Sequence, residues 1–277
     1  MSLGTFLSKN RFSQAFISRY IIPMGAAIWS TPDGQMLEFP AQTFARFFEN
    51  HGLLSVTDHP QWYSIKGGSH EYVKAFLKGF TGKVFTNSPV RRIVREDSGI
   101  RIMTDAGESS YDAVVMASHA DETLAMLADP SPAETRLLSP WRYTENQTVL
   151  HTDPGYLPPL ARARSSWNYL KGETSGAVMS MTYYMNMLHD LKSKNDYCVT
   201  LNPRTQIPDH RKIAEFLYTH PQFSTDAVAT QQDLDRLSGE RSTYSAGPVS
   251  GMVFMKMRCC RRSGWRKKSG YPYDAPI

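Results

Sequence analysis

A glycine pair between an extended segment and a helix constrains this chain more than any other feature. Gly67 and Gly68 follow the extended stretch Trp62–Ile65, and Ser69 after them predicts a helix N-cap, because its hydroxyl can accept from the free amides of the first turn. Two glycines at such a place let backbone amides approach an anionic ligand closely. A tight turn between strand and helix explains the same residues, so the pair alone leaves both interpretations open.

The segments on either side of the glycine pair predict amphipathic helices. After the pair, apolar residues recur at helical spacing; they are Tyr72, Val73, Phe76, Leu77 and Phe80. Before it, residues 3–54 are predicted to be mostly helical, and Phe39–Gly52 predicts a helix with Pro40 in its first turn and Gly52 past its end. Three phenylalanines of this helix are expected to face a core rather than a cofactor: Phe44, Phe47 and Phe48.

A run of short strands follows. Lys83–Asn87 predicts a strand, and Val90–Arg95 and Ile100–Thr104 alternate in polarity, with turn residues after each. Alternation is typical of a hairpin meander with one solvated face. Ala113–Ala117 is instead a near-continuous apolar run, which suits a strand buried on both faces of a parallel sheet. The sequence therefore predicts a meander that leads into the edge of a doubly wound sheet.

The exit of this apolar strand is a candidate site. Open α/β sheets bind ligands at the carboxyl ends of their strands, which would place Ser118 and His119 at a cofactor edge. A core strand with a polar exit accounts for the same two residues, and both interpretations stay open. A helix is predicted over Asp121–Leu127, with Asp121 as its N-cap.

The second half of the chain changes character. Three segments predict strands of a mixed or antiparallel sheet; they are Gln147–Thr152, Val178–Tyr184 and Tyr197–Leu201. Two segments predict helices, Lys212–Tyr218 and Ser224–Leu237, the latter with Ser224 as N-cap. The order of elements therefore predicts an α/β fold in which part of the chain is of the mixed α+β kind.

Composition excludes several function classes. The net charge is +5, but residues 240–277 hold eight Lys and Arg against two acids, so the rest of the chain is nearly neutral and is not expected to bind nucleic acid. No apolar run is long enough to span a membrane, and the N-terminus does not have the pattern of a secretory signal. Three cysteines, two of them adjacent, favour a reducing compartment, and we expect a cytoplasmic location.

No catalytic motif stands out in the printed sequence. It contains no G-x-G-x-x-G, no P-loop, no CxxC and no G-x-S-x-G. Its eight histidines have no metal-binding spacing, so no metal site is expected. His151 and His220 have aspartates nearby in the sequence and are interpreted as ordinary polar residues.

Several stretches taken together nevertheless resemble one family. The chain is similar to the flavin-containing amine oxidase superfamily, and within it to a branch described as predicted NAD/FAD-dependent oxidoreductases. The resemblance covers nearly all of residues 1–239. The stretches that carry it are Ile21–Ser30, Phe47–Leu54, Trp62–Val73, Ser88–Arg95, Tyr111–Ser131, Arg142–Asp153, Ser165–Leu170, Thr182–Leu191, Val199–Pro203 and His220–Gly239.

The resemblance implies a partial FAD-binding Rossmann-type domain with an inserted β-meander, plus a substrate domain of mixed sheet and helices. It implies FAD as cofactor, a small-molecule substrate, and hydride transfer from that substrate to flavin N5. It also favours a cofactor-side role for the glycine pair over a plain turn, and it suggests that Trp167 places an aromatic side chain near the flavin. The cofactor-binding residues carried over by position are Gly67, Gly68, Val90, Ala117, Ser118, His119 and Trp167.

The printed sequence departs from the family pattern at both ends. The N-terminal strand and G-x-G-x-x-G are absent, and so is the C-terminal flavin motif, so we expect a fragment that holds FAD poorly and is inactive. The alternative is a non-catalytic remnant or binding module without FAD. The domains expected are a helical substrate-side segment at 1–60, a partial FAD domain at 61–140, a substrate domain at 141–239 and a basic tail at 240–277.

The tail itself is expected to be disordered or out of frame. Methionine has a single codon, so Met252, Met255 and Met257 fix most of the underlying bases. Read one base out of register, residues 252–260 permit YGFHEDALL, which resembles the missing flavin motif. We therefore expect a frameshift near Tyr244. Sequencing the locus in independent transcripts tests this expectation.

Overall fold

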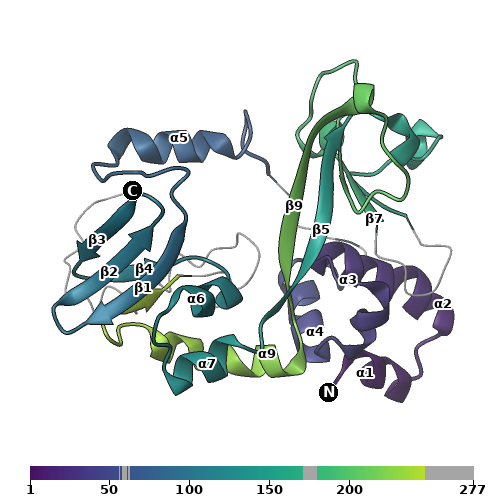
Figure 1. Ribbon diagram of the computed structural model, residues 1–277. Helices are drawn as coiled ribbons and strands as arrows, with labels where there is room; N and C mark the ends of the chain where they lie inside the picture. Colours follow the sequence, from purple (N-terminus) through teal and green to yellow (C-terminus); the bar gives the residue numbers. More distant parts are fainter. Residues whose placement is uncertain (56, 58–60, 62, 171–179, 247–277) are drawn as a thin grey trace. The chain divides into compact units, whose positions relative to one another are not determined.

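The computed structural model describes residues 1–55, 57, 61, 63–170 and 180–246. The chain divides into two compact units, each built from two segments (Figure 1). The first unit combines Met1–Gly82 with Tyr143–Gln222, and the second combines Lys83–Arg142 with the chain from Phe223 onward. Trp62, the first residues of the strand predicted from Val178, and the tail from residue 247 lie outside the described residues. The four functional domains expected from the sequence stay a prediction.

The N-terminal part of the first unit is helical, as predicted. Its elements are α1 (Leu3–Lys9), α2 (Gln14–Phe16), a π-helical turn (Ile17–Ile21), α3 (Ile22–Trp29), a 3-10 turn (Asp33–Glu38) and α4 (Ala41–Asn50). Trp29 of α3 packs on Phe44 of α4 with ring centroids 5.5 Å apart, and Phe44 stacks on Phe48 at 4.2 Å. Gly25 admits this packing, because a Cβ there would overlap the Met36 side chain. The prediction that Phe44 and Phe48 face a core is confirmed.

A five-stranded sheet forms the other part of the first unit. Its strands are β5 (Arg142–His151), β6 (Trp167–Leu170), β7 (Ser180–Tyr184), β8 (Cys198–Leu201) and β9 (Lys212–Gln222), in the order β6-β7-β8-β5-β9. The pairs β6–β7, β7–β8 and β8–β5 are antiparallel. Helix α8 (Met185–Leu188) follows β7. Three of these strands confirm the predicted strands Gln147–Thr152, Val178–Tyr184 and Tyr197–Leu201 over their described residues.

Strand β9 corrects one prediction. Lys212–Tyr218 was expected to be a helix, but it is the first part of β9, the edge strand beside β5. Gln147 of β5 donates to the Glu215 carboxylate of β9 at 2.5 Å, and Thr152 N–H donates to the Arg211 carbonyl at 2.9 Å. Pairing with a neighbouring strand satisfies the backbone here, and it overrides the weak local helix propensity of this segment.

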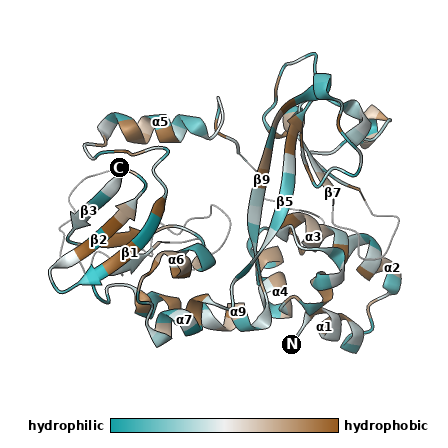
Figure 2. Cartoon of the chain, in the orientation of Figure 1, coloured by the Kyte–Doolittle hydropathy of each residue, from teal (hydrophilic) through white to brown (hydrophobic). Residues whose placement is uncertain are grey.

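Helix α5 (His70–Gly79) lies where the sequence predicted it, but its apolar face is exposed. Phe76 is 64% exposed and Tyr72 48%, and Figure 2 shows apolar residues along this helix as well as on α3 and α4. Ser69 precedes the helix, but its hydroxyl makes no capping hydrogen bond, so that part of the prediction is wrong. The amphipathic pattern therefore identified the helix correctly without identifying a partner for it.

The second unit contains the predicted meander. Strands β1 (Val90–Glu96), β2 (Gly99–Thr104) and β3 (Gly107–Tyr111) pair antiparallel in that order, while β4 (Val114–Met116) pairs in parallel with β10 (Thr243–Ser245). Its helices are α6 (Ala120–Met126), α7 (Pro132–Leu138) and α9 (Thr225–Thr230), and a 3-10 turn follows at Leu234–Leu237. The buried apolar side chains around the meander are Ile93, Ile100, Met116 and Leu127.

Three predictions for the second unit need correction. Lys83–Asn87 is not a strand, and its Phe85 is 68% exposed. Strand β4 is not buried on both faces, since Met116 is buried but Val115 is half exposed. The predicted helix Ser224–Leu237 is divided into α9 and the 3-10 turn, although Ser224 is its N-cap and accepts from Ala227 N–H at 3.1 Å.

Candidate functional site

A cleft of about 660 Å³ opens in the second unit between β1, β2, β4 and α6. Its walls are mainly apolar, with Ile93, Ile102 and Met126 among the side chains that line it. Val90 at the start of β1 and Ala117 and Ser118 after the end of β4 also line it. Three of the residues that sequence resemblance assigned to a cofactor therefore meet at one place.

The local structure at the exit of β4 is set by the start of α6. His119 is the N-cap residue of α6, and its backbone N–H donates to the Glu122 carboxylate at 3.0 Å. The Ser118 hydroxyl lies 2.9 Å from the Thr123 hydroxyl in the same first turn. The expected N-cap, Asp121, is instead in the first turn, so that prediction is wrong by two residues. His119 is not among the residues that line the cleft.

The charged side chains of the cleft are already engaged. Arg91 lines it and forms a two-pronged pair with Asp105, at 2.9 and 2.8 Å. This hydrogen bonding lowers the pKa of Asp105 and raises the pKa of Arg91. Glu122, which also lines the cleft, places its carboxylate on the N-terminus of α6. Among the described lining residues no cation is left unpaired for an anionic ligand.

The residues that line the cleft can be compared with what the adenine ring and the pyrophosphate of FAD each require. Its apolar walls fit a flat heteroaromatic ring, which gains from leaving water and needs few polar contacts. A pyrophosphate needs backbone amides or cations. Among the described residues that line the cleft the one cation is Arg91, which is already paired with Asp105. The residues present therefore fit the adenine end of FAD better than its pyrophosphate.

The glycine pair belongs to the first unit. Both residues have left-handed backbone angles, with φ of +87° at Gly67 and +92° at Gly68, which explains why glycine stands at both positions. Gly68 N–H donates to the Ile65 carbonyl at 2.9 Å, and the Gly68 carbonyl accepts from Glu71 N–H at 3.1 Å. The structure thus shows a tight turn at the glycine pair, one of the two interpretations that the sequence left open. A cofactor role for the pair stays a prediction.

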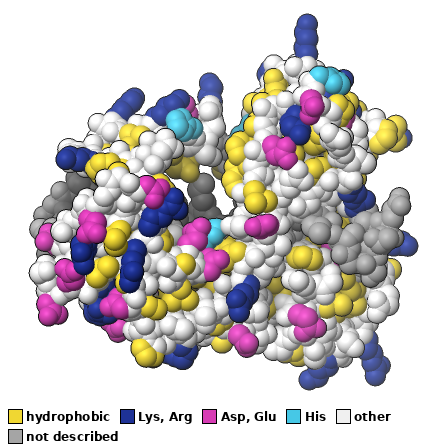
Figure 3. Space-filling view, in the orientation of Figure 1, with side chains coloured by type: hydrophobic (Ala, Val, Ile, Leu, Met, Phe, Trp, Pro, Cys, Tyr) yellow, Lys and Arg dark blue, Asp and Glu magenta, His cyan; other side chains and the backbone are white. Residues whose placement is uncertain are grey.

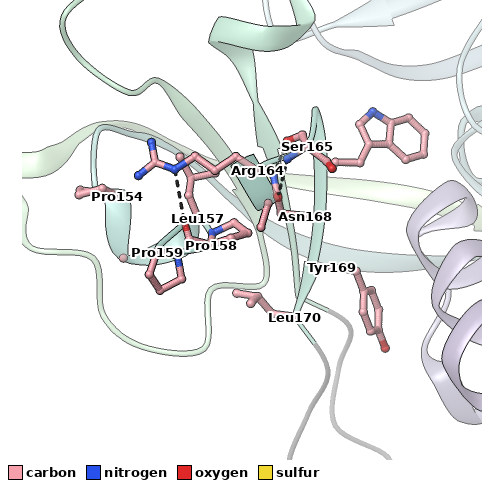
Figure 4. Close-up of a pocket in the computed structure, with 12 residues that line it drawn as sticks. Pro154, Leu157, Pro158, Pro159, Arg164, Ser165, Asn168, Tyr169 and Leu170 are labelled. Atoms are coloured by element: carbon pink, nitrogen blue, oxygen red, sulfur yellow. Dashed lines mark hydrogen bonds between the residues drawn. The ribbon is translucent and has the colours of Figure 1, made fainter. Parts of the chain in front are cut away.

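Trp167 begins β6, also in the first unit. Its indole is 39% exposed and meets Tyr183 edge-on, with ring centroids 5.6 Å apart. It lines a cavity of about 720 Å³ between β6 and the segment from Pro154 to Arg164, shown in Figure 4. Arg164 also lies in this wall. It belongs to no motif, and the sequence shows only that a cationic residue follows several prolines.

His151 is buried in the sheet of the first unit and acts as a structural residue. Its Nδ1 accepts from Asp153 N–H at 3.1 Å, so the neutral ring donates through Nε2 to Thr200 Oγ1 at 2.7 Å. Thr200 Oγ1 lies 2.8 Å from Thr182 Oγ1 on the next strand. Burial lowers the pKa of His151 and outweighs the opposite effect of Asp153.

The described residues contain no group of His, Cys, Asp and Glu side chains that could hold a metal ion. None of the helices in the described part of the chain is long and apolar enough to cross a membrane.

The fold defines the class of protein. It is an α/β protein with a β-meander, a parallel strand pair and a separate antiparallel sheet. The sequence pattern of the flavin containing amine oxidoreductase family matches residues 4–154, more than half of the chain. The chain belongs to that family. No curated protein matches it significantly.

Solved structures share the fold at low sequence identity. A fatty acid isomerase from P. acnes superposes with a TM-score of 0.61 at 16% identity, over 89% of this chain and 61% of that one. A putative protoporphyrinogen oxidase from Exiguobacterium sp. 255-15 gives 0.63 at 14%, over 98% and 66%. Cyclohexylamine oxidase from Brevibacterium oxydans IH-35A gives 0.63 at 11%, over 97% and 66%. The chain thus spans about two thirds of the length of these proteins.

Proposed function

We propose that this chain is part of an FAD-dependent oxidoreductase of the amine-oxidase type, which oxidises a small molecule by hydride transfer to the flavin. The observation that carries the proposal is the cleft of the second unit, where Val90, Ala117 and Ser118 meet. Family membership supports the cofactor. The similarity to cyclohexylamine oxidase makes a small amine a reasonable substrate to test. A cytoplasmic location, favoured by cysteine usage, is part of the same proposal.

The residues of the cleft would hold the adenine end of FAD. Val90, Ile102 and Met126 supply apolar contact to the ring, and Ala117 leaves room for it at the exit of β4. Ser118 would border the ribose while its hydroxyl stays bonded to Thr123. Bound flavin supplies the hydride acceptor. Gly67, Gly68, His119 and Trp167 keep their predicted cofactor-side roles.

A second function is favoured by the charges of the cleft. Arg91 is committed to Asp105, and the Glu122 carboxylate stands at the N-terminus of α6, where it would repel a phosphate. A chain with this arrangement fits adenine better than pyrophosphate. The alternative proposal is therefore a non-catalytic remnant or binding module that does not retain FAD.

Nucleotide binding by the purified chain separates the two proposals. We expect FAD to bind weakly in a calorimetric titration and ADP to compete with it. Ala117→Trp fills the cleft from an exposed position and is expected to weaken binding by about tenfold or more. Ala113→Trp is the matched control, since Ala113 is exposed and does not line the cleft.

The outcomes are distinct. Binding of FAD that Ala117→Trp weakens and Ala113→Trp leaves unchanged supports the oxidoreductase proposal. Absence of both FAD and ADP binding in a folded chain contradicts it and favours the remnant.

A further inference from the structure

The cavity between β6 and the segment Pro154–Arg164 lies entirely in the first unit and is separate from the nucleotide cleft. One wall is β6, which is the edge strand among the described strands of its sheet and pairs with β7. The opposite wall holds Pro158 and Pro159, with Leu157 beside them. The volume of about 720 Å³ is in the range of small-molecule pockets, and such pockets are mostly apolar with a few placed polar groups.

Most of the polar side chains in this cavity are already satisfied. The Asn168 side chain bonds the backbone of Ser165 twice, accepting from its N–H at 3.2 Å and donating to its carbonyl at 2.6 Å. The Tyr169 hydroxyl donates to the Asp33 carboxylate at 2.6 Å. Among the described residues that line the cavity, Arg164 is the one with a formal charge.

Arg164 is fixed in place by two groups. Its Nε donates to the Pro158 carbonyl at 3.2 Å, and one terminal nitrogen donates to Asp196 at 3.0 Å. Asp196 is held in turn by the Tyr184 hydroxyl at 2.6 Å. A guanidinium offers five donors, so a positioned Arg164 retains N–H groups for a further acceptor.

We propose that this cavity binds a molecule with an apolar body and a carboxylate, with Arg164 as the carboxylate-binding residue. An apolar body gains from contact with the prolines, Leu157 and Trp167, and a carboxylate makes a stronger hydrogen bond to the Arg164 guanidinium than a neutral acceptor does. A cationic ligand would be repelled by the same guanidinium. Asp196 neutralises part of the charge and orients the group, which makes recognition depend on a hydrogen bond as well as on charge. The proposal goes beyond the proposed oxidoreductase and does not require flavin.

Two sources could supply this chemistry, a free carboxylic acid or the C-terminal carboxylate of a peptide. The test is calorimetric titration of the full chain with octanoate below its micelle concentration, beside octylamine and octanol. A short peptide ending in leucine and its amidated form make up the second arm. We expect octanoate to bind at least about tenfold more tightly than octanol, and octylamine not to bind.

Variants assign the site. Arg164→Gln is expected to weaken octanoate binding by roughly tenfold to a hundredfold, the usual range for one hydrogen bond to a charged group. Arg162→Gln is the matched control, because Arg162 is exposed two residues away, in the 3-10 turn Ala161–Ala163, and does not line the cavity. Ala163→Phe fills the cavity from an exposed position and should abolish binding while leaving the melting temperature unchanged.

Several results would overturn the proposal. Equal affinity for octanoate and octanol, or equal loss in the Arg164 and Arg162 variants, contradicts the role of Arg164. Unchanged binding in Ala163→Phe places the ligand elsewhere. If Arg164→Gln lowers the melting temperature, the Ala163 variant still decides the question. Binding of the peptide carboxylate but not of octanoate would contradict a free acid as the ligand and assign the site to a peptide terminus.

Discussion

The helical part of the first unit has a core of packed aromatic rings, whereas the second unit buries an ion pair beside its apolar core. In the first unit Trp29 packs on Phe44 with ring centroids 5.5 Å apart, Phe44 stacks on Phe48 at 4.2 Å, and Phe48 is only 2% exposed. In the second unit the side chain of Arg95 on β1 is 2% exposed and bonds both oxygens of Glu134 on α7, at 2.6 and 3.0 Å.

The ion pair of the second unit extends into a network. Arg95 also reaches Asp129, and Arg241, just before β10, contacts the Asp129 carboxylate and donates to the Arg95 carbonyl at 3.0 Å. Acidic and basic side chains lie close together on the surface of the second unit (Figure 3). On the meander, Arg101 pairs with both Glu96 and Glu108. These charges tie the segment around β10 to β1, although the two are far apart in the sequence.

The contrast shows that substitutions destabilise the two units for different physical reasons. Removing a packed ring costs transfer energy and leaves a cavity. Removing one partner of a buried ion pair leaves the other charge uncompensated, even where the pair itself adds little net stability. The two units should therefore respond differently to truncation, charge removal and acid.

The largest effect is expected from Phe48→Ala in the first unit. The ring is nearly fully buried and stacks on Phe44, so the substitution should lower the free energy of unfolding by about 3–5 kcal/mol. Urea denaturation measures this change. Hydrogen exchange should rise first in peptides from α3 and α4. A loss below about 1 kcal/mol would show that the aromatic core is not the main support of this unit.

Arg95→Met should give the next largest effect, in the second unit. It leaves the buried Glu134 without its cation, and the expected loss is about 3 kcal/mol. Arg91→Met is the matched control, because the Arg91–Asp105 pair is exposed and should contribute far less. Adding Glu134→Gln to Arg95→Met should recover part of the loss. If both arginine variants lose the same amount, the contrast between buried and exposed pairs is wrong.

Acid gives an independent check on the same pair. Burial alone would raise the pKa of Glu134, but hydrogen bonds from Arg95 and Ser131 and attraction to Arg95 outweigh it and lower the pKa from 4.5. The unfolded chain therefore takes up the proton first. The stability that this carboxylate contributes is fully present above about pH 4.5 and is lost as the pH falls below it. Arg95→Met should weaken that pH dependence.

Sequence periodicity predicted which segments have a buried face more reliably than it predicted what covers them. Phe44 and Phe48 lie at helical spacing and are buried, but Tyr72 and Phe76 have the same spacing and remain exposed. Spacing reports a local repeat, while a partner is a long-range property. The same limit explains β9, where sheet pairing at residues distant in sequence overrode a helix-like pattern.

The candidate sites divide in the same way. Val90, Ala117 and Ser118 came from resemblance, and the structure brings them to one cleft because β1 and β4 lie close together in the second unit. Arg164 carried no motif, because its significance depends on the cavity wall and on Asp196, thirty-two residues away. A side chain whose role arises only from folding leaves no signal in a single sequence.

The smallest effect is expected from Phe76→Ser on α5, and it sharpens the contrast with Phe48 inside one unit. Both side chains belong to ten-residue helices with apolar faces, yet Phe76 is 64% exposed. The change should alter the free energy of unfolding by no more than about 0.5 kcal/mol, measured by the same urea titration. It should also reduce association of the chain with itself, since a contiguous exposed apolar face favours aggregation. A destabilisation of the size expected for Phe48→Ala would contradict the exposure of the α5 face.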